Sequence, residues 1–244
     1  MDTTRPSLAW LLLLLQLCRP AFALENGLAR RPPMGWMAWQ RFTCQTDCES
    51  RPSECVSARL FREMADRLVE DGFRELGYEY VSIDDCWSEL ARNERGQLEP
   101  DRRRFGERGI GELAEYMHAR KLKLGLYGDC GTRTCAGYPS QLAAADEGRS
   151  LEPTGATYFE RDAHSLAHWQ VDAFKFDGCY LDPLKAESVC PRMASALQSA
   201  RYLTRPILLI CEWPFYQMYA HARTNFSLAA QSCNLWRYYD DIEG

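Results

Sequence analysis

The chain contains apolar runs that stop abruptly on an acidic residue, and this recurring pattern constrains its fold more than any other feature. One run, at residues 174–177, ends on Asp177 and has Lys175 two positions earlier. Similar runs end on Asp84 and Asp85 and on Glu212. Near-continuous apolar runs are typical of strands buried on both faces of a parallel sheet. Carboxylates grouped at the ends of such strands favour sugar chemistry.

Six apolar runs are expected to be strands, and helical patterns lie between them. The strands are expected at residues 33–39, 78–85, 122–129, 171–178, 206–213 and 235–241. The helices are expected after a cap near Ser57 and at residues 111–120, 158–169 and 191–201. This alternation predicts a parallel sheet, and acids at the carboxyl ends of strands favour a (β/α)8 TIM barrel over a doubly wound sheet. No glycine-rich phosphate loop follows a strand, which weakens the nucleotide-binding alternative.

Length and charge limit the classes of function. A chain of 244 residues with 46% hydrophobic residues fits one large domain or two small ones and can form a sizeable core. The formal net charge is −5 and the sequence contains no basic stripe, so we expect no nucleic-acid partner. The arginines at 102–104 are flanked by acids and are interpreted as a solvated surface.

Residues 1–23 are predicted to be a secretory signal peptide. Arg5 precedes an apolar run at residues 8–17, and Ala21 and Ala23 form a cleavage signal of small residues. The run is too short to span a bilayer, and no later segment is apolar for long enough to do so. We therefore expect a mature chain that starts near Leu24 and enters the secretory pathway.

The cysteines are expected to form disulfides. Of the 11 cysteines, Cys18 lies in the predicted signal peptide, and the other ten enter an oxidising compartment. A zinc site at Cys44, Cys48 and Cys55 is a weak alternative because these residues contain no CxxC pair. Asn225 begins a glycosylation sequon, which is consistent with the secretory route.

Six motifs occur in order and cover nearly all of the mature chain. They are PMGWMAW at 33–39, IDDCW at 83–87, KLGLY at 123–127, KFDGC at 175–179, CEWP at 211–214 and WRYYDDI at 236–242. Together they resemble the lysosomal α-galactosidase and α-N-acetylgalactosaminidase family. The resemblance implies a retaining glycoside hydrolase, which needs two carboxyl groups about 5 to 5.5 Å apart.

The resemblance also implies roles for individual residues. It makes Asp177 the nucleophile and Asp241 the acid/base, and Lys175 would favour the ionised form of Asp177. Asp240 is an adjacent rival to Asp241 that sequence alone does not exclude. The expected substrate-binding residues are Trp39 as a wall for the sugar, Asp84 and Asp85 as acceptors for the 4- and 6-hydroxyls, and Tyr127, Lys175, Glu212, Phe215, Tyr216 and Arg237 around the pocket.

Two positions after the fifth expected strand bear on the substrate. Glu212 can bond a 2-hydroxyl, and Phe215 would clash with an N-acetyl group, so the preferred substrates are terminal α-galactosides. The sister activity, α-N-acetylgalactosaminidase, remains the alternative because residues 39–41 and 238–242 look closer to that branch. We expect no cofactor and no metal, since His164 and His168 lack the glutamate of a zinc protease between them.

The resemblance pairs eight of the cysteines and leaves Cys130 and Cys190 open, either bonded to each other or free. The implied disulfides are Cys44–Cys86, Cys48–Cys55, Cys135–Cys179 and Cys211–Cys233. Residues 141–155 look like an insertion relative to the family and are expected to form a flexible surface loop. The resemblance also implies delivery to the lysosome, or secretion, and a homodimer in the full-length form.

The chain ends at Gly244, where members of the family continue through two further strands and a C-terminal β-sandwich domain. Six strands cannot close an eight-stranded barrel, so we expect an incomplete barrel whose edges expose backbone groups. An inactive truncated product is therefore a third alternative, and the 244-residue product alone is expected to have negligible α-galactosidase activity.

Overall fold

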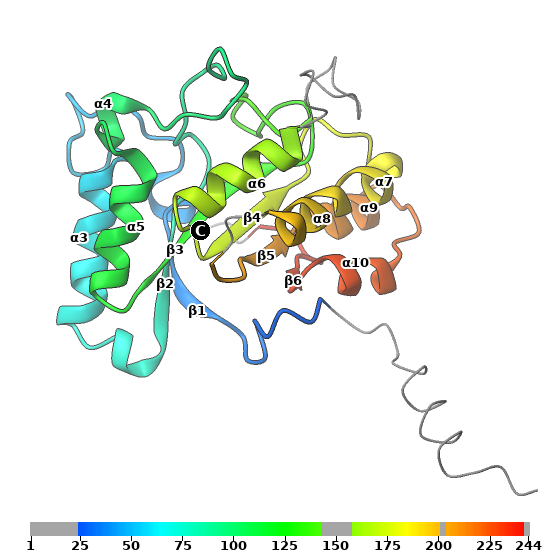
Figure 1. Cartoon of the computed structure of the whole chain (residues 1–244), viewed down its shortest axis with the longest axis horizontal. Helices are drawn as coiled ribbons and strands as arrows, with labels where there is room; N and C mark the ends of the chain where they lie inside the picture. The colour runs from blue at the N-terminus through cyan, green and yellow to red at the C-terminus, as the bar shows by residue number, and fades with distance from the viewer. Residues whose placement is uncertain (1–23, 143–157, 201–203, 242–244) are drawn as a thin grey trace, which may run out of the picture.

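The computed structural model describes residues 24–142, 158–200 and 204–241, so the predicted signal peptide lies outside the described residues (Figure 1). The described residues form a single six-stranded sheet in which every neighbouring pair is parallel. Its strands, in both chain and spatial order, are β1 (Met34–Met37), β2 (Tyr78–Ser82), β3 (Lys123–Asp129), β4 (Ala173–Asp177), β5 (Leu208–Cys211) and β6 (Leu235–Trp236). The sheet curls into part of a (β/α)8 barrel, as the sequence predicts.

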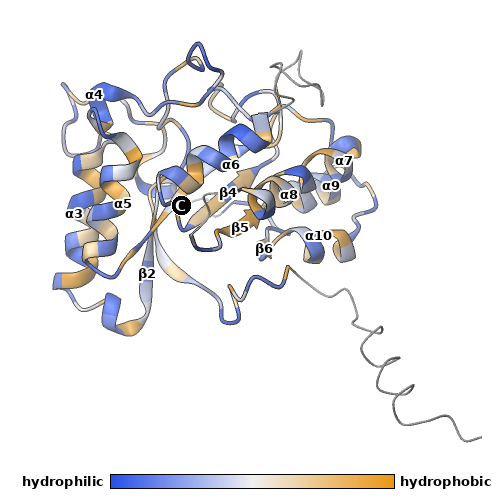
Figure 2. Ribbon diagram, in the orientation of Figure 1, coloured by the Kyte–Doolittle hydropathy of each residue, from blue (hydrophilic) through white to orange (hydrophobic). Residues whose placement is uncertain are grey.

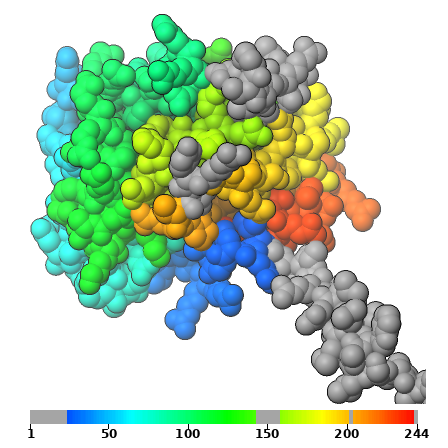
Figure 3. All heavy atoms as spheres, viewed as in Figure 1, coloured from blue at the N-terminus to red at the C-terminus, as the bar shows by residue number. Residues whose placement is uncertain are grey.

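Helices connect the strands and cover the outer face of the sheet. The longer ones are α3 (Ala58–Glu70), α5 (Gly109–Ala119), α6 (Tyr158–His168), α8 (Pro191–Ser199), α9 (Trp213–Tyr219) and α10 (Phe226–Ser232). The short ones are α2 (Trp39–Phe42), α4 (Arg102–Phe105), α7 (Ala186–Val189) and the 3₁₀ turns η1 (Arg74–Leu76) and η2 (Pro183–Lys185). In Figure 3, α5, α6 and α8 form one continuous layer over the visible face.

The helix α3 illustrates why these elements form where they do. Ser57 accepts a hydrogen bond from the backbone of Leu60 and so caps the helix at the expected position. The apolar residues Leu60, Phe61, Ala65 and Leu68 recur at helical spacing and are all buried. Burying one such large side chain contributes about 1.5–3 kcal/mol. The exposed side of α6, by contrast, is mainly hydrophilic in Figure 2.

Strand β3 ends at Asp129 as predicted, but the other strands end earlier than predicted at their carboxyl ends. Strand β2 stops at Ser82 because Asp84 and Asp85 each accept a hydrogen bond from the next backbone N–H, which replaces the ladder. Cys86 then adopts a φ of 70°, outside the extended region. Trp39 begins the helix α2 instead of ending β1.

The last strand differs most from its prediction. The strand expected at 235–241 is only Leu235–Trp236, so Asp240 and Asp241 lie on an irregular segment beyond it. Strand β5 ends at Cys211 because Glu212 is already the N-cap of α9, and the proline that follows occupies the first turn of that helix.

All ten cysteines from Cys44 to Cys233 are described, and they form five disulfides. Four of these are the pairs that the resemblance implies: Cys44–Cys86, Cys48–Cys55, Cys135–Cys179 and Cys211–Cys233. The fifth joins Cys130 to Cys190, which selects between the alternatives left open for these two residues.

The expected insertion begins in the core rather than at the surface. Gln141 is completely buried, because its side chain bonds the backbone of Asp129 and the carboxylate of Asp162. Residues 143–155 of that segment lie outside the described residues. Within the described residues, no helix combines the length and the apolar character needed to cross a bilayer.

Candidate active site

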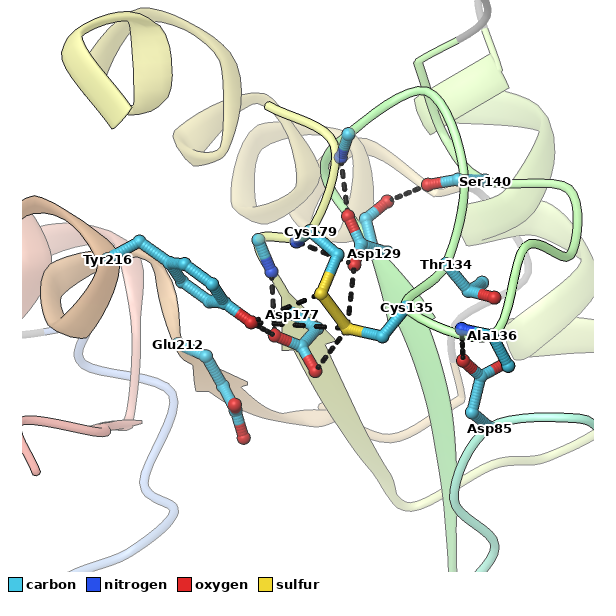
Figure 4. The surroundings of a disulfide bond; sticks show 12 residues. Asp85, Asp129, Thr134, Cys135, Ala136, Ser140, Asp177, Cys179, Glu212 and Tyr216 are labelled. Atoms are coloured by element: carbon cyan, nitrogen blue, oxygen red, sulfur yellow. Dashed lines mark hydrogen bonds between the residues drawn. A yellow bond between two sulfur atoms is a disulfide. The ribbon is translucent and has the colours of Figure 1, made fainter. Parts of the chain in front are cut away.

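Asp177 ends the strand β4 at the carboxyl edge of the sheet and is only 5% exposed. Its carboxylate accepts three hydrogen bonds: from the hydroxyl of Tyr127 over 2.9 Å, from the hydroxyl of Tyr216 over 2.7 Å and from the backbone of Gly178 over 2.8 Å. Figure 4 shows the bond from Tyr216. Three such hydrogen bonds fix the position and the orientation of the carboxylate. These are the properties that a carboxylate nucleophile requires.

The Cys135–Cys179 disulfide lies directly against this carboxylate. Cys135 Sγ is 3.5 Å from Asp177 Oδ2, and Cys179 Sγ is 3.3 Å from the Tyr216 hydroxyl oxygen (Figure 4). Asp129, Asp177 and the two cysteines come within 4.8 Å of one another, a spacing compatible with a metal ion. However, sulfurs bonded to each other are not the thiolates that bind metals, so this group does not suit a metal.

Lys175 connects two strand ends of the site. Its ammonium group is 2.9 Å from Asp84 Oδ2 and 3.4 Å from Glu212 Oε1. Burial alone would lower the pKa of Lys175, but the charges of Asp84, Glu212 and Asp177 raise the pKa above its ordinary value. The cation therefore stays charged and neutralises the acids around it, and its direct partners are Asp84 and Glu212 rather than Asp177.

Glu212 lies among groups that shift its pKa in opposite directions. Burial and the charge of Asp177 raise the pKa of Glu212 to about 7, although the charges of Lys175 and Arg237 oppose this effect. Arg237 Nη1 is 3.0 Å from Glu212 Oε2, and its guanidinium carbon lies 3.9 Å from the centre of the Phe215 ring. The carboxylate is thus held between two cations, one of which is stacked on an aromatic ring.

Asp84 and Asp85 are almost completely buried where β2 ends. Asp85 accepts hydrogen bonds from the backbone of Cys86 over 2.7 Å and of Ala136 over 2.9 Å. Burial raises the pKa of Asp85 above its ordinary value. Each carboxylate oxygen can accept two hydrogen bonds, so both residues keep acceptor capacity for sugar hydroxyls.

Asp241 and Trp39 are placed differently from the rest of the predicted site. The side chain of Asp241 is 67% exposed and pairs with Arg237 Nη2 over 3.2 Å, while Asp240 is 3.7 Å from the same nitrogen. Asp241 is thus connected to Glu212 through Arg237, which pairs with both carboxylates. Trp39 is half-buried at the start of α2.

A cavity of about 180 Å³ lies on the inner side of the sheet. Lys175 and Glu212 line it together with apolar residues of β1 to β5. Lys175 and Glu212 therefore line this cavity and also belong to the charged cluster at the strand ends.

Sequence reasoning missed Asp129, which ends β3 beside Asp177. It is completely buried and its carboxyl group accepts backbone hydrogen bonds from Gly131 over 2.6 Å and Cys179 over 2.9 Å. The signal was present, since the run at 122–129 also ends on an acid. Asp129 lies outside the six motifs that suggested the other site residues.

The fold and the site together define a class of protein, the glycoside hydrolases built on a (β/α)8 barrel with carboxylates at the strand ends. The family described as "Alpha galactosidase A" matches residues 31–244. The chain belongs to this family.

Individual relatives agree with this assignment. Alpha-N-acetylgalactosaminidase of Gallus gallus is 50% identical over 220 residues, which cover 90% of this chain and 50% of that protein. Alpha-galactosidase A of Homo sapiens is 42% identical over 223 residues, covering 91% of this chain and 48% of that protein. The chain thus spans about half the length of the curated relatives it matches.

Solved structures show the same fold. The α-galactosidase from Saccharomyces cerevisiae with raffinose superposes with a TM-score of 0.66 at 29% identity, covering 87% of this chain and 40% of that one. An α-galactosidase described as putative from Bacteroides fragilis gives a TM-score of 0.69 at 29% identity, covering 87% and 39%.

Proposed function

We propose that the protein is a retaining exo-glycosidase that removes terminal α-D-galactosyl residues from glycolipids, glycoproteins and oligosaccharides. The observation that carries this proposal is the unit formed by Glu212, Arg237 and Phe215. Glu212 offers a hydrogen-bond acceptor for a 2-hydroxyl, and the bulky ring of Phe215 restricts the space in which a 2-acetamido group would have to fit.

In the proposed mechanism, Asp177 attacks the anomeric carbon and Asp241 protonates the leaving oxygen. The covalent glycosyl-enzyme is then hydrolysed by water, from which Asp241 removes a proton. Tyr127 and Tyr216 hold the attacking carboxylate in place before the first step. Their hydrogen bonds weaken as the carboxylate charge is transferred into the new bond, so they favour the return of the nucleophile in the second step.

Substrate binding is assigned to the surrounding acids. Asp84 and Asp85 accept hydrogen bonds from the 4- and 6-hydroxyls, and Trp39 provides an apolar wall for the sugar ring. Lys175 orients Asp84, since its ammonium group pairs with that carboxylate over 2.9 Å.

A second candidate is α-N-acetylgalactosaminidase activity. The observation that favours it is the higher identity to relatives of that name, 46% for the Homo sapiens protein against 42% for Alpha-galactosidase A of the same species.

Hydrolysis of p-nitrophenyl α-galactoside and of its N-acetylgalactosaminide analogue separates the two activities. The assay uses the secreted chain and a chimera in which the remaining half of a relative follows Gly244. We expect a higher kcat/KM for the galactoside. Whichever of the two proteins hydrolyses it is called the active form, and its Asp177→Asn variant should show no hydrolysis. A higher kcat/KM for the N-acetylgalactosaminide favours the second candidate, and hydrolysis of neither compound contradicts both.

We also propose that residues 24–244 are the catalytic domain and that the protein reaches the lysosome through the secretory pathway as a homodimer. The five disulfides support an oxidising route. Asn225 is exposed at the N-cap of α10, where a glycan can be attached.

A further inference from the structure

Asp129 is a fully buried carboxyl group beside the nucleophile for which the mechanism above has no use. It accepts the backbone N–H of Gly131, in the loop after β3, and that of Cys179, in the turn after Asp177. A single side chain therefore fastens two loops at the active end of the sheet (Figure 4). Cys179 is also bonded to Cys135, whose sulfur contacts the carboxylate of Asp177.

We propose that Asp129 is a positioning residue for the nucleophile. Its carboxyl group holds the peptide N–H of Cys179, and through the Cys135–Cys179 disulfide it sets the wall against which Asp177 lies. The inference rests on the proposed function, in which Asp177 attacks the sugar.

The surroundings of Asp129 are built to keep it in place. Its backbone N–H bonds the side chain of Gln141 over 2.8 Å, and Gln141 in turn bonds Asp162 over 2.9 Å. Arg92 completes the chain with two contacts of 2.7 Å to the carboxylate of Asp162. This buried polar network extends from α6 to the nucleophile turn, and fully satisfied networks of this kind make a local structure rigid.

Asp129 acts through hydrogen bonds rather than through charge. Burial and the nearby charge of Asp177 raise the pKa of Asp129 well above its ordinary range, which favours the neutral acid. The contribution of Asp129 is therefore the geometry of the turn, which should affect the reaction step more than sugar binding by Asp84, Lys175 and Glu212.

Asp129→Asn tests this division. Asparagine has nearly the same shape and no charge, but its amide nitrogen cannot accept a hydrogen bond, so one of the two backbone contacts is lost. We expect kcat for the preferred substrate to fall at least about tenfold while KM changes by less than about threefold. Amide hydrogen exchange should become faster at Gly131 or Cys179.

Asp172→Asn is the matched control. Asp172 is buried just before β4, at the opposite end of the same strand, and bonds the backbone of Leu124 and the side chain of His118. We expect Asp172→Asn and Asp129→Asn both to lower the melting temperature. Asp172→Asn should leave kcat within about threefold of wild type, because the active sites of such barrels lie at the other end of the strands. If Asp129→Asn fails to fold, Gln141→Met leaves the carboxyl group of Asp129 intact, removes the contacts of Gln141 to the Asp129 backbone and to Asp162, and should lower kcat in the same direction.

The two readouts separate failure of the inference from failure of the proposed function. Exchange is measured on the secreted chain itself, and kinetics on whichever form hydrolyses substrate. Unchanged exchange at Gly131 and Cys179 overturns the inference even where no form is active, and inactivity of every wild-type form overturns only the proposed function. An unchanged kcat in a folded Asp129→Asn or Gln141→Met variant, or an equal loss of kcat in Asp172→Asn, also overturns the inference.

Discussion

Arg237 stacks on Phe215 with its guanidinium carbon 3.9 Å from the ring centre, while its Nη1 pairs with Glu212 over 3.0 Å. A guanidinium group can stack with its face and pair with its edge, so the ring and the carboxylate stabilise the same orientation of the cation. The two positions that are proposed to face the 2-substituent of the sugar are thus connected through Arg237.

Replacing both positions should therefore change the substrate. Glu212→Ser with Phe215→Ala removes the acceptor for the 2-hydroxyl and opens volume beside it, which should shift relative transition-state binding toward N-acetylgalactosaminides by about 2–3 kcal/mol. The ratio of kcat/KM values for the two p-nitrophenyl sugars measures the shift. Tyr219→Ala is the control, because it removes an exposed ring 5.8 Å from Phe215 and should leave the ratio unchanged. An unchanged ratio in the double variant would show that these positions do not set specificity.

The sequence predicted the strands well because their apolar runs report burial on both faces. It could not predict their ends, since Asp84, Asp85 and Glu212 leave the ladder to bond or cap neighbouring backbone. Predicted strand 235–241 failed for a different reason: Trp236 is the last residue that pairs with β5, at Cys211.

The site residues could be predicted in kind but not in their contacts. Lys175 was expected to act on Asp177, its neighbour along the strand, and the two charges do interact, but the direct partner of its ammonium group is Asp84, which is 91 positions away. Such a contact depends on how neighbouring strands are staggered, and a single sequence does not report stagger. The Cys130–Cys190 disulfide has the same origin, because it depends on how α7 and α8 pack over the loop after β3.

The raised pKa of Glu212 predicts that this residue contributes more to the stability of the protein at acidic pH than at neutral pH. A pKa of about 7 in the folded protein exceeds the ordinary value of 4.5, so the folded state binds this proton more tightly than the unfolded state does. The resulting stabilisation is complete below pH 4.5 and is lost as the pH rises through about 7. Because each pKa unit corresponds to about 1.4 kcal/mol, the loss should reach at most about 3 kcal/mol.

Urea unfolding at the two ends of this pH range measures the effect. Glu212→Gln cannot titrate and should show a smaller decrease in the free energy of unfolding between pH 4.5 and pH 7. A pH dependence equal to that of wild type would show that Glu212 is not the group responsible.

The nucleophile assignment predicts where a covalent intermediate forms. A mechanism-based galactosyl inhibitor should label the active form on Asp177, and Asp177→Asn should abolish labelling because the amide is not a nucleophile. Mass spectrometry of the peptide that spans residues 171–185 detects the adduct. Asp182→Asn changes an exposed carboxylate on the following turn and should still be labelled. A label retained by Asp177→Asn would assign the nucleophile to another acid.

The last prediction compares two glycines that differ in the space available for an added side chain. A Cβ atom at Gly131 would lie 1.8 Å from the carbonyl oxygen of Cys179, and both groups belong to backbone that cannot rotate away. At Gly111, in the helix α5, the nearest atom to such a Cβ is 3.9 Å away, on Trp169, which is an ordinary contact.

The same substitution should therefore have opposite effects at the two positions. Gly111→Ala should stabilise the protein by about 0.5–1 kcal/mol, because alanine restricts the unfolded chain and favours the helix. Gly131→Ala should destabilise it by about 1–3 kcal/mol, because overpacking forces backbone shifts. Since the shift separates the loops after β3 and β4, it should also move the Cys135–Cys179 disulfide away from Asp177 and lower kcat. Thermal unfolding and kinetics of both variants check this, and a Gly131→Ala variant with wild-type stability and kcat would show that the loops can separate without disturbing the nucleophile.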